Sequence, residues 1–191
     1  MKMLGIEKRF VNAPGHARAV ARAAQELLAQ IEVHPGWRYL DVGCGVGSAA
    51  RAIAESHDLD VTGVDIDPEQ IATANAGTPR PNLRYVTMNA TALQFGEAEF
   101  DVVASSMATH HIRRWEAALG EMVRVLRPGG YLLYVDLMFP EWLARVGRLL
   151  VPVMGFPSKK QLDRFASQTG LAPVFQSRSA LELHSIYRKA G

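Results

Sequence analysis

The sequence lacks the features that mark secreted, membrane-spanning and disulfide-stabilised proteins. Its 191 residues contain one cysteine, Cys44, so no intramolecular disulfide can form. No apolar run is long enough to cross a bilayer, and charged residues interrupt the few apolar residues that follow Met1. We therefore expect a chain without a secretory signal or a transmembrane segment, for which the cytoplasm is the default compartment.

The sequence also has little excess charge of either sign. Lys and Arg number 21 against 19 Asp and Glu, a net charge of +2, and the basic residues are scattered along the chain. Nucleic-acid-binding domains cluster positive charge on one face, so we expect no nucleic-acid partner. Hydrophobic residues make up 48% of the 191 residues, which is typical of a single globular domain with one sizeable core.

What the sequence does contain is a glycine-rich turn at the end of an apolar run. The stretch Tyr39-Leu40-Asp41-Val42-Gly43-Cys44-Gly45-Val46-Gly47-Ser48 leads from that run into three alternating glycines. Glycine adopts backbone angles closed to other residues and removes side chains where a ligand must touch the chain. Asp65 ends the next apolar run, and together these features predict a nucleotide-like ligand.

The spacing of the glycines favours a methyl donor over a dinucleotide. The dinucleotide fingerprint G-x-G-x-x-G would need a glycine at Ser48, whereas the third glycine is Gly47. Asp41 would repel a pyrophosphate, but it suits the ammonium and sulfonium groups of S-adenosylmethionine. The helix expected after Gly47 favours the carboxylate of the same molecule. We predict S-adenosylmethionine as the cofactor, with these loop residues as its ligands: Asp41, Gly43, Cys44, Gly45 and Gly47.

Together with four later passages, this loop resembles the class I S-adenosylmethionine-dependent methyltransferases, in particular their small-molecule branch, which includes quinone-biosynthesis enzymes. The passages run in order as YLDVGCGVG (39–47), VTGVDIDPEQI (61–71), YVTMNATALQF (85–95), FDVVASSMATHHI (100–112) and VRVLRPGGYLLYVD (123–136). The resemblance implies a doubly wound, mostly parallel seven-stranded sheet with helices on both faces and a closing antiparallel strand at the C-terminus.

Helix and strand signals alternate along the chain, which by itself predicts one α/β domain. Strands are expected at 39–42, 60–65, 83–88, 101–104 and 131–135, with a closing pair at 172–177 and 181–188. Helices are expected at 13–31, 48–56 and 115–126, and after the capping residues Asp67 and Ser158. We divide the domain (1–191) into an N-terminal helical cap (1–35), a cofactor-binding core (36–137), a substrate-side insertion (138–157) and a final helix with the strand pair (158–191).

Ligands of such sheets bind at the carboxyl ends of the strands, which selects the loop after each strand. Asp65 lies at such an end, where its paired oxygens could accept hydrogen bonds from both ribose hydroxyls. The family resemblance adds two further groups. It places Ile66, Asn89 and Ala90 around the adenine ring, and Ser105 and Ser106 beside the methionyl part of the cofactor. The family often carries an acid where Asn89 stands.

Two adjacent histidines, His110 and His111, follow the fourth strand and are the candidates for catalysis. Histidine titrates in the useful pH range, so either one could serve as general base or substrate ligand for a hydroxyl or carbon acceptor. The alternative is that one packs on neighbouring loops and the other is solvated. We expect no metal site, because adjacent side chains tend to point apart and no Cys or carboxylate cluster completes the pair. Cys44 is interpreted as a small packing residue.

The insertion carries an apolar stripe at helical spacing, formed by Trp142, Leu143, Val146, Leu149, Leu150, Val153 and Met154. In the family such insertions often cover the substrate, and a lid of this composition would suit an apolar or aromatic acceptor. Core packing and a homodimer interface are the alternative uses of the stripe. Phe10 and Asn12 in the N-terminal segment are further candidates to close the pocket.

The sequence therefore predicts an enzyme that transfers a methyl group from S-adenosylmethionine to a small organic acceptor, at oxygen, nitrogen or activated carbon. The single Cys44 argues against arsenite methylation, which relies on several cysteines in the sibling enzymes. Ser105-Ser106-Met107-Ala108 is not the Asn/Asp-Pro-Pro-Tyr/Phe motif of enzymes that methylate adenine or glutamine. RNA or protein methylation, a non-catalytic cofactor-binding module and an NAD-dependent oxidoreductase remain as alternatives.

Overall fold

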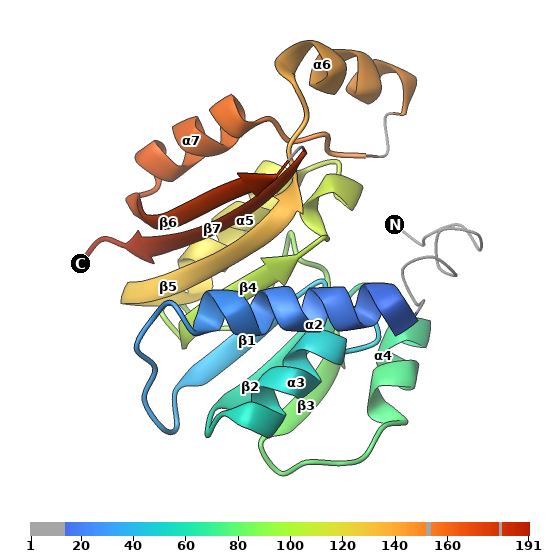
Figure 1. Cartoon of the computed structure of the whole chain (residues 1–191), viewed down its shortest axis with the longest axis vertical. Helices are drawn as coiled ribbons and strands as arrows, with labels where there is room; N and C mark the ends of the chain where they lie inside the picture. The colour runs from blue at the N-terminus through green and yellow to red at the C-terminus, as the bar shows by residue number, and fades with distance from the viewer. Residues whose placement is uncertain (1–13, 152–153, 180) are drawn as a thin grey trace.

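A computed structural model, which describes residues 14–151, 154–179 and 181–191, shows an α/β domain built on one sheet (Figure 1). The seven strands lie in the order β3-β2-β1-β4-β5-β7-β6. They are β1 (Arg38–Val42), β2 (Asp60–Asp65), β3 (Leu83–Thr87), β4 (Phe100–Ser106), β5 (Leu126–Leu137), β6 (Leu171–Ser179) and β7 (Glu182–Lys189). The helices are α2 (Pro14–Leu28), α3 (Ser48–Ser56), α4 (Pro68–Asn75), α5 (Trp115–Val125), α6 (Glu141–Leu150) and α7 (Lys159–Gln168), with a short 3₁₀ turn, η1 (Thr109–His111).

The sheet is parallel through its first five strands and antiparallel at its end. β1 pairs in parallel with both β2 and β4, so the strand order reverses between these two neighbours. β3 and β5 extend the parallel sheet on either side. β7 runs antiparallel to both β5 and β6. This topology confirms the predicted doubly wound, mostly parallel seven-stranded sheet with its closing antiparallel strand.

Two apolar cores lie on opposite faces of this sheet. Strand β5 shows the separation, because its side chains alternate: Leu133 and Val135 enter the core under α2 and α3, whereas Leu132 and Tyr134 enter the core under α5 and α7. A strand that is buried on both faces needs apolar residues at consecutive positions. This explains why the central strands read as continuous apolar runs in the sequence.

The start of β5 differs from the prediction. The turn residues 127–130 were expected to separate a helix from a strand at 131–135, but β5 already begins at Leu126. Leu126 pairs with Phe100, and the register then shifts so that Tyr131 pairs with Val102. A side chain at Gly130 would place its Cβ 2.7 Å from the carbonyl oxygen of Asp101. The segment is thus an irregularity within the strand. Its proline and glycines are residues that also form turns, so in the sequence it looks like a loop.

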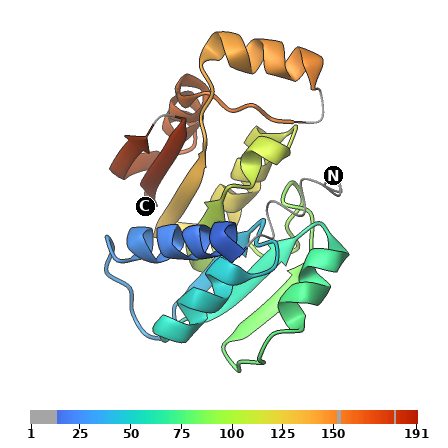
Figure 2. The same ribbon diagram turned by 45° about the vertical axis from the view of Figure 1, so that its right-hand side comes forward.

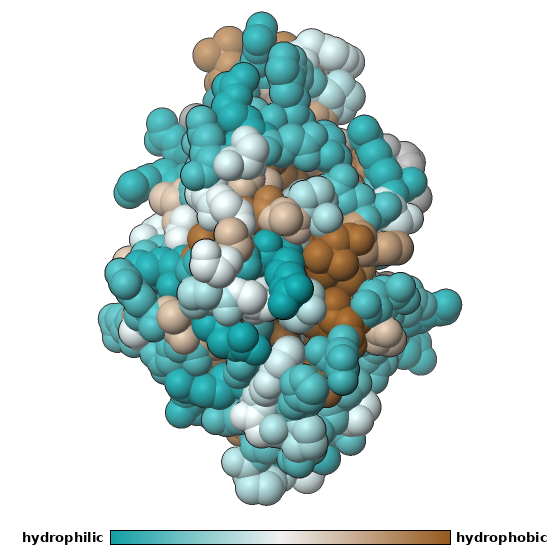
Figure 3. Space-filling model, turned by 90° about the vertical axis from the view of Figure 1, so that its left-hand side faces the viewer, coloured by the Kyte–Doolittle hydropathy of each residue, from teal (hydrophilic) through white to brown (hydrophobic). Residues whose placement is uncertain are grey.

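Helix α6, the middle of the predicted insertion, stands at one end of the molecule in both ribbon views (Figures 1 and 2). Its apolar stripe faces outward: Trp142, Leu149 and Leu150 are 68%, 81% and 73% exposed. Hydrophobic colour is visible at the same end of the space-filling view (Figure 3). Within α6 only Ala144 and Gly147 are buried, so core packing is the wrong interpretation of the stripe. Val153 lies outside the described residues, as do Phe10 and Asn12.

The two predicted helix caps are present. Asp67 accepts a hydrogen bond from the backbone of Glu69 at 3.0 Å, and Ser158 forms a capping box with Gln161 at the start of α7. Within residues 14–151, 154–179 and 181–191, no helix has the length and apolar character required to cross a bilayer.

Candidate functional site

A cavity of about 440 Å³ opens at the carboxyl ends of the parallel strands, where the strand order reverses. Helix α2 contributes Ala17 and Val20 to its wall. Nine of the predicted site residues line it: Gly43, Cys44, Gly45, Asp65, Ile66, Asn89, Ala90, Ser106 and His111. Four others are absent from the lining: Asp41, Gly47, Ser105 and His110.

The three glycines of the loop adopt left-handed backbone angles, with φ of +79° at Gly43, +53° at Gly45 and +79° at Gly47. Their surroundings differ. A Cβ at Gly43 would lie 2.4 Å from the Cβ of Ala108, and one at Gly47 would lie 2.5 Å from the ring of Tyr85. A Cβ at Gly45 would meet no atom within 4 Å. The outer glycines therefore allow close packing, and the middle one keeps the loop surface free for a ligand.

Asp65 fixes the shape of this loop. One carboxylate oxygen accepts a hydrogen bond from the backbone N–H of Gly45 at 3.0 Å, and the other accepts one from Asp67 at 2.9 Å. Burial raises the pKa of Asp65, although these two N–H groups oppose the shift. Each carboxylate oxygen can accept more than one hydrogen bond, so the predicted ribose contact is compatible with this structural role.

Asp41 lies beneath the loop and not on its surface. Its side chain is 2% exposed, and Oδ2 has no hydrogen-bond partner among the described residues. Burial raises the pKa of Asp41 to about 7. The hydrogen bond from the backbone of Ala50 lowers this pKa in part, and the charge of the nearby Asp65 raises it further. A cation in the cavity would stabilise the ionised carboxylate. The loop residues thus fit a cofactor that carries positive charge.

Two polar residues of the prediction, Asn89 and Ser105, have local partners, and a third, Cys44, is half-buried. The side-chain oxygen of Asn89 accepts hydrogen bonds from the backbone and the hydroxyl of Thr91, both at 3.0 Å, so this oxygen already holds a turn beside the position predicted for adenine. Ser105 donates to the carbonyl of Val42 at 3.0 Å and ties β4 to β1. Burial raises the pKa of the Cys44 thiol well above its usual value, which favours the interpretation of a packing residue over a nucleophile.

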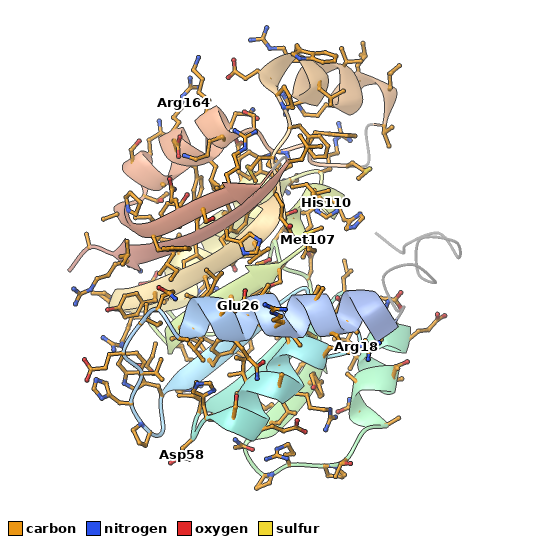
Figure 4. All side chains as sticks on the ribbon, viewed as in Figure 1. Arg18, Glu26, Asp58, Met107, His110 and Arg164 are labelled. Carbon is orange, nitrogen blue, oxygen red and sulfur yellow. The ribbon has the colours of Figure 1, made fainter. Side chains whose placement is uncertain are left out.

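The two histidines have different surroundings. His111 lines the cavity, whereas His110 is 5% exposed and its Nδ1 is hydrogen-bonded to Asp136. The expectation that the rings point apart is wrong: their centroids lie 4.0 Å apart, with the planes tilted by 42°. The tight turn η1 brings the two side chains together, as an extended chain would not. Figure 4 shows His110 beside Met107 beyond the end of β4.

Sequence reasoning missed the residue that organises this turn, Asp136 at the end of β5. Its Oδ2 accepts hydrogen bonds from the backbone and hydroxyl of Thr109, at 2.7 and 2.5 Å, and from the backbone of His110 at 3.2 Å. Its Oδ1 accepts from the ring of His110 and from the backbone of Leu137. Because the Thr109 hydroxyl donates to Asp136, the hydroxyl of Tyr134, 2.5 Å away, is the donor to Thr109.

These donors set the charge of Asp136. Complete burial alone raises the pKa of a carboxyl group, but the hydrogen bond and charge of His110 outweigh it, with help from Thr109 and Leu137. The pKa of Asp136 is therefore below its usual value. An acid at the carboxyl end of a parallel strand was the signal available in the sequence, and it is the same rule that selected Asp65.

Metal ligation has no support in the part of the chain that the structure describes. Within it, His, Cys, Asp and Glu side chains form no group of three or more that could hold a metal ion.

Comparisons with known proteins agree with this geometry. Residues 40–134 match a family model described as a methyltransferase domain. The chain is 35% identical to the O-methyltransferase rstn1 of Aspergillus nomiae over 167 residues, which cover 82% of this chain and 73% of that protein. It is 33% identical to the 2-methyl-6-phytyl-1,4-hydroquinone methyltransferase of Synechocystis over 150 residues, which cover 72% of this chain and 47% of that protein. The chain thus spans about half the length of the second relative.

The fold has a close counterpart among solved structures. A methyltransferase solved with the Haloferax volcanii Trm112 methyltransferase activator superposes with a TM-score of 0.79 at 20% identity, over 97% of this chain and 98% of that chain. At this identity the likeness concerns the fold alone. The family model and the sequence relatives carry the assignment further: the methyl donor is S-adenosylmethionine, and the chain belongs to the class I S-adenosylmethionine-dependent methyltransferases that act on small molecules.

Proposed function

We propose that this enzyme methylates a largely apolar acceptor at a hydroxyl group or at a carbon that a hydroxyl activates, most simply in a phenol or hydroquinone. The observation that carries the proposal is the placement of His111 on the cavity wall, next to a histidine that Asp136 holds in place. Met88, Met107 and Ile112 give the wall its apolar character. Two relatives named for O-methyl and hydroquinone methyl transfer support this acceptor class.

We infer distinct roles for the two sides of the cavity. Asp65 binds the ribose, Ile66 packs on the adenine with Asn89 and Ala90 at its edge, and the loop of Gly43 to Gly47 faces the methionyl part. Ile66 is 45% exposed and lines the cavity, which suits a residue that a flat ring covers. Ser106 lines the cavity and is the better candidate for the methionyl contact than Ser105, which is hydrogen-bonded to β1.

Methyl transfer requires little acid–base chemistry from the protein. When bound, the cofactor supplies a methyl group activated by a sulfonium. His111 accepts the proton of the acceptor hydroxyl, which concentrates electron density on the attacking oxygen or on the ring carbon that it activates. His110 is a positioning residue: Asp136 fixes its Nδ1, and its ring packs against that of His111. The apolar wall keeps water away from the methyl group.

The proposal is tested by transfer of labelled methyl from S-adenosylmethionine to a panel of phenols, catechols and hydroquinones. His111→Gln should lower kcat by about 10²- to 10⁴-fold while the affinity for S-adenosylmethionine stays within about two-fold. His34→Gln, at an exposed histidine, is the matched control and should leave kcat unchanged. A His111→Gln enzyme as fast as the wild type would remove the base role.

Calorimetry with S-adenosylmethionine, S-adenosylhomocysteine and NAD separates the remaining alternatives. Cofactor binding without product from any acceptor would favour a non-catalytic module, and transfer to RNA or protein alone would overturn the acceptor class. A homodimer through the exposed stripe of α6 stays a prediction, which sedimentation of the chain and of a Leu149→Ser variant would check.

A further inference from the structure

Two arginines stand on the cavity wall directly after His111. Arg113 and Arg114 link η1 to α5, both line the cavity, and both are exposed. Neither makes a hydrogen bond, an ion pair or a ring contact with any described residue. Some arginines of the described residues are engaged, such as Arg124, which donates to Glu121 and to the carbonyls of Leu93 and Phe95, whereas others, such as Arg178, have no such contact. What distinguishes Arg113 and Arg114 is their position on the cavity wall, where a ligand can pair with them.

The charge around these arginines is not balanced within the cavity wall. Asp65 is the one acidic residue among the described lining residues, and its two oxygens hold the glycine loop. Glu116 lies in the first turn of α5, exposed and away from the lining. Arg114 occupies the N-cap position of α5, and no side chain caps that helix. The N–H groups of the first turn add positive potential to that of the two side chains.

We propose that the acceptor carries an anionic oxygen group, such as a carboxylate or a sulfonate, on its apolar framework, and that Arg113 and Arg114 bind it. The inference rests on the proposed function, because it describes the molecule that His111 acts on. A guanidinium offers two parallel N–H donors that match the two oxygens of such a group. Apolar side chains next to it, Met107 and Ile112, would contact the framework.

The spacing along the chain agrees with one small acceptor. The Cα atoms of residues two apart are separated by at most about 7 Å, so the side chains of His111 and Arg113 start from neighbouring points of the same cavity wall. An acceptor held by its anionic group at Arg113 would present its hydroxyl to His111. Orientation of this kind is what binding must supply for methyl transfer. The arginines are thus binding residues that select and align the acceptor.

The competing explanation is that the arginines bind the carboxylate of the cofactor itself. The two explanations differ in what the arginines discriminate. An acceptor site distinguishes an anionic aromatic molecule from its neutral counterpart, whereas a cofactor site changes the affinity for S-adenosylhomocysteine. Both quantities are measurable with the full chain and without knowledge of the natural acceptor.

The experiment uses two fluorescent probes that share one aromatic framework. The first is 8-anilinonaphthalene-1-sulfonate and the second is its neutral counterpart N-phenyl-1-naphthylamine. Each is titrated into the wild type and into an Arg113→Gln/Arg114→Gln double variant, with and without saturating S-adenosylhomocysteine. We expect the double variant to bind the sulfonate at least about ten-fold more weakly and the neutral probe within about two-fold of the wild type. Arg178→Gln, at an exposed arginine of β6, is the matched control and should change neither.

Salt provides a second readout. Raising NaCl from about 50 mM to about 500 mM should weaken sulfonate binding to the wild type and leave the neutral probe unaffected, because the contact is exposed to solvent. The proposal is overturned if the double variant binds the sulfonate as the wild type does, or if it loses the two probes equally. It is also overturned if the variant instead loses affinity for S-adenosylhomocysteine by about ten-fold, which would assign the arginines to the cofactor.

These outcomes are separate from the failure of the proposed function. Charge discrimination between the probes does not require turnover, so it can be present while His111→Gln leaves kcat unchanged. Conversely, a fully active enzyme that treats 3,4-dihydroxybenzoate and its methyl ester alike, with and without the arginines, would refute the anionic acceptor and leave the methyltransferase intact.

Discussion

Two buried aspartates at the ends of two strands have opposite electrostatic characters. Asp41 at the end of β1 and Asp136 at the end of β5 are 2% and 0% exposed. The pKa of Asp41 is raised to about 7 because of burial, and its Oδ2 has no hydrogen-bond partner among the described residues. The pKa of Asp136 is lowered, because a histidine ring, a hydroxyl and three backbone N–H groups outweigh its burial.

The contrast separates the two sides of the cavity. On the proposed cofactor side, the backbone of Ala50 donates to the carboxylate of Asp41, but Oδ2 has no partner among the described residues, so a cationic ligand would stabilise the ionised group. On the acceptor side the carboxylate is fully satisfied, and it serves to hold η1 and the two histidines in one arrangement. Burial alone therefore does not decide what an aspartate does; the number of donors around it does.

Replacing Asp136 by Asn should have the largest effect, because it removes the buried negative charge and replaces one of two accepting oxygens with an NH2 group that faces other donors. We expect the free energy of unfolding to fall by about 3–5 kcal/mol, as for removal of one partner of a buried ion pair. Urea unfolding measures it, with Asp58→Asn at an exposed position as the control, expected to change stability by less than about 0.5 kcal/mol.

The same variant tests the sign of the pKa shift. A lowered folded pKa means that Asp136 stabilises the fold above the unfolded pKa of about 4, and that this contribution is lost as the pH falls through the folded value. The wild type should therefore lose more stability below about pH 4 than Asp136→Asn does. A constant difference between the two proteins from acid to neutral pH would contradict the shift.

The glycine loop allows a graded test on the cofactor side. Gly36 has φ of +77°, and a Cβ there would meet no described atom within 4 Å. Gly36→Ala should therefore lower the free energy of unfolding by about 1–2 kcal/mol, the cost of a left-handed backbone at a residue with a side chain. Gly47→Ala adds a contact of 2.5 Å with Tyr85 and should be destabilised by about 1–3 kcal/mol more. Gly45→Ala should unfold like Gly36→Ala but bind S-adenosylhomocysteine more weakly. Normal binding by Gly45→Ala would show that the cofactor does not touch the loop there.

Asp41→Asn should have a smaller effect that depends on pH. Because the folded pKa of Asp41 is raised to about 7, its contribution to stability is complete below the unfolded pKa and is lost as the pH rises through the folded value. The variant should therefore gain stability relative to the wild type as the pH rises from about 4 to about 8. Thermal unfolding measures this gain. Saturating S-adenosylmethionine should reduce the gain in stability at about pH 8. A gain of equal size at about pH 4 and about pH 8 would be inconsistent with the raised pKa.

The two sides also differ in how far they could be predicted from the sequence. The proposed cofactor side depends on local spacing: three alternating glycines and the acid that ends the next strand mark the loop in the sequence, and the structure adds a hydrogen bond from Gly45 to Asp65. The acceptor side depends on the pairing of β4 with β5, which brings Thr109 to Asp136 across 27 residues of sequence. No local pattern encodes such a contact, so the sequence offered the two histidines as candidates but not Asp136, the residue that holds His110.

Two further differences have the same origin. Residues 127–130 look like a loop in sequence, and only the neighbouring strand shows that they are an irregular start of β5. The apolar periodicity of α6 correctly predicted a helix, but periodicity does not say whether the apolar face meets the body of the protein or points away from it.

The hydrogen bond from Ser105 to the carbonyl of Val42 joins the strand that leads into the glycine loop to the strand that leads into the histidine turn. This bond lies in the paired centre of the sheet, and it makes the distance between the two halves of the cavity a property of strand spacing. Changes in the turn after β4 can consequently occur without displacing the glycine loop.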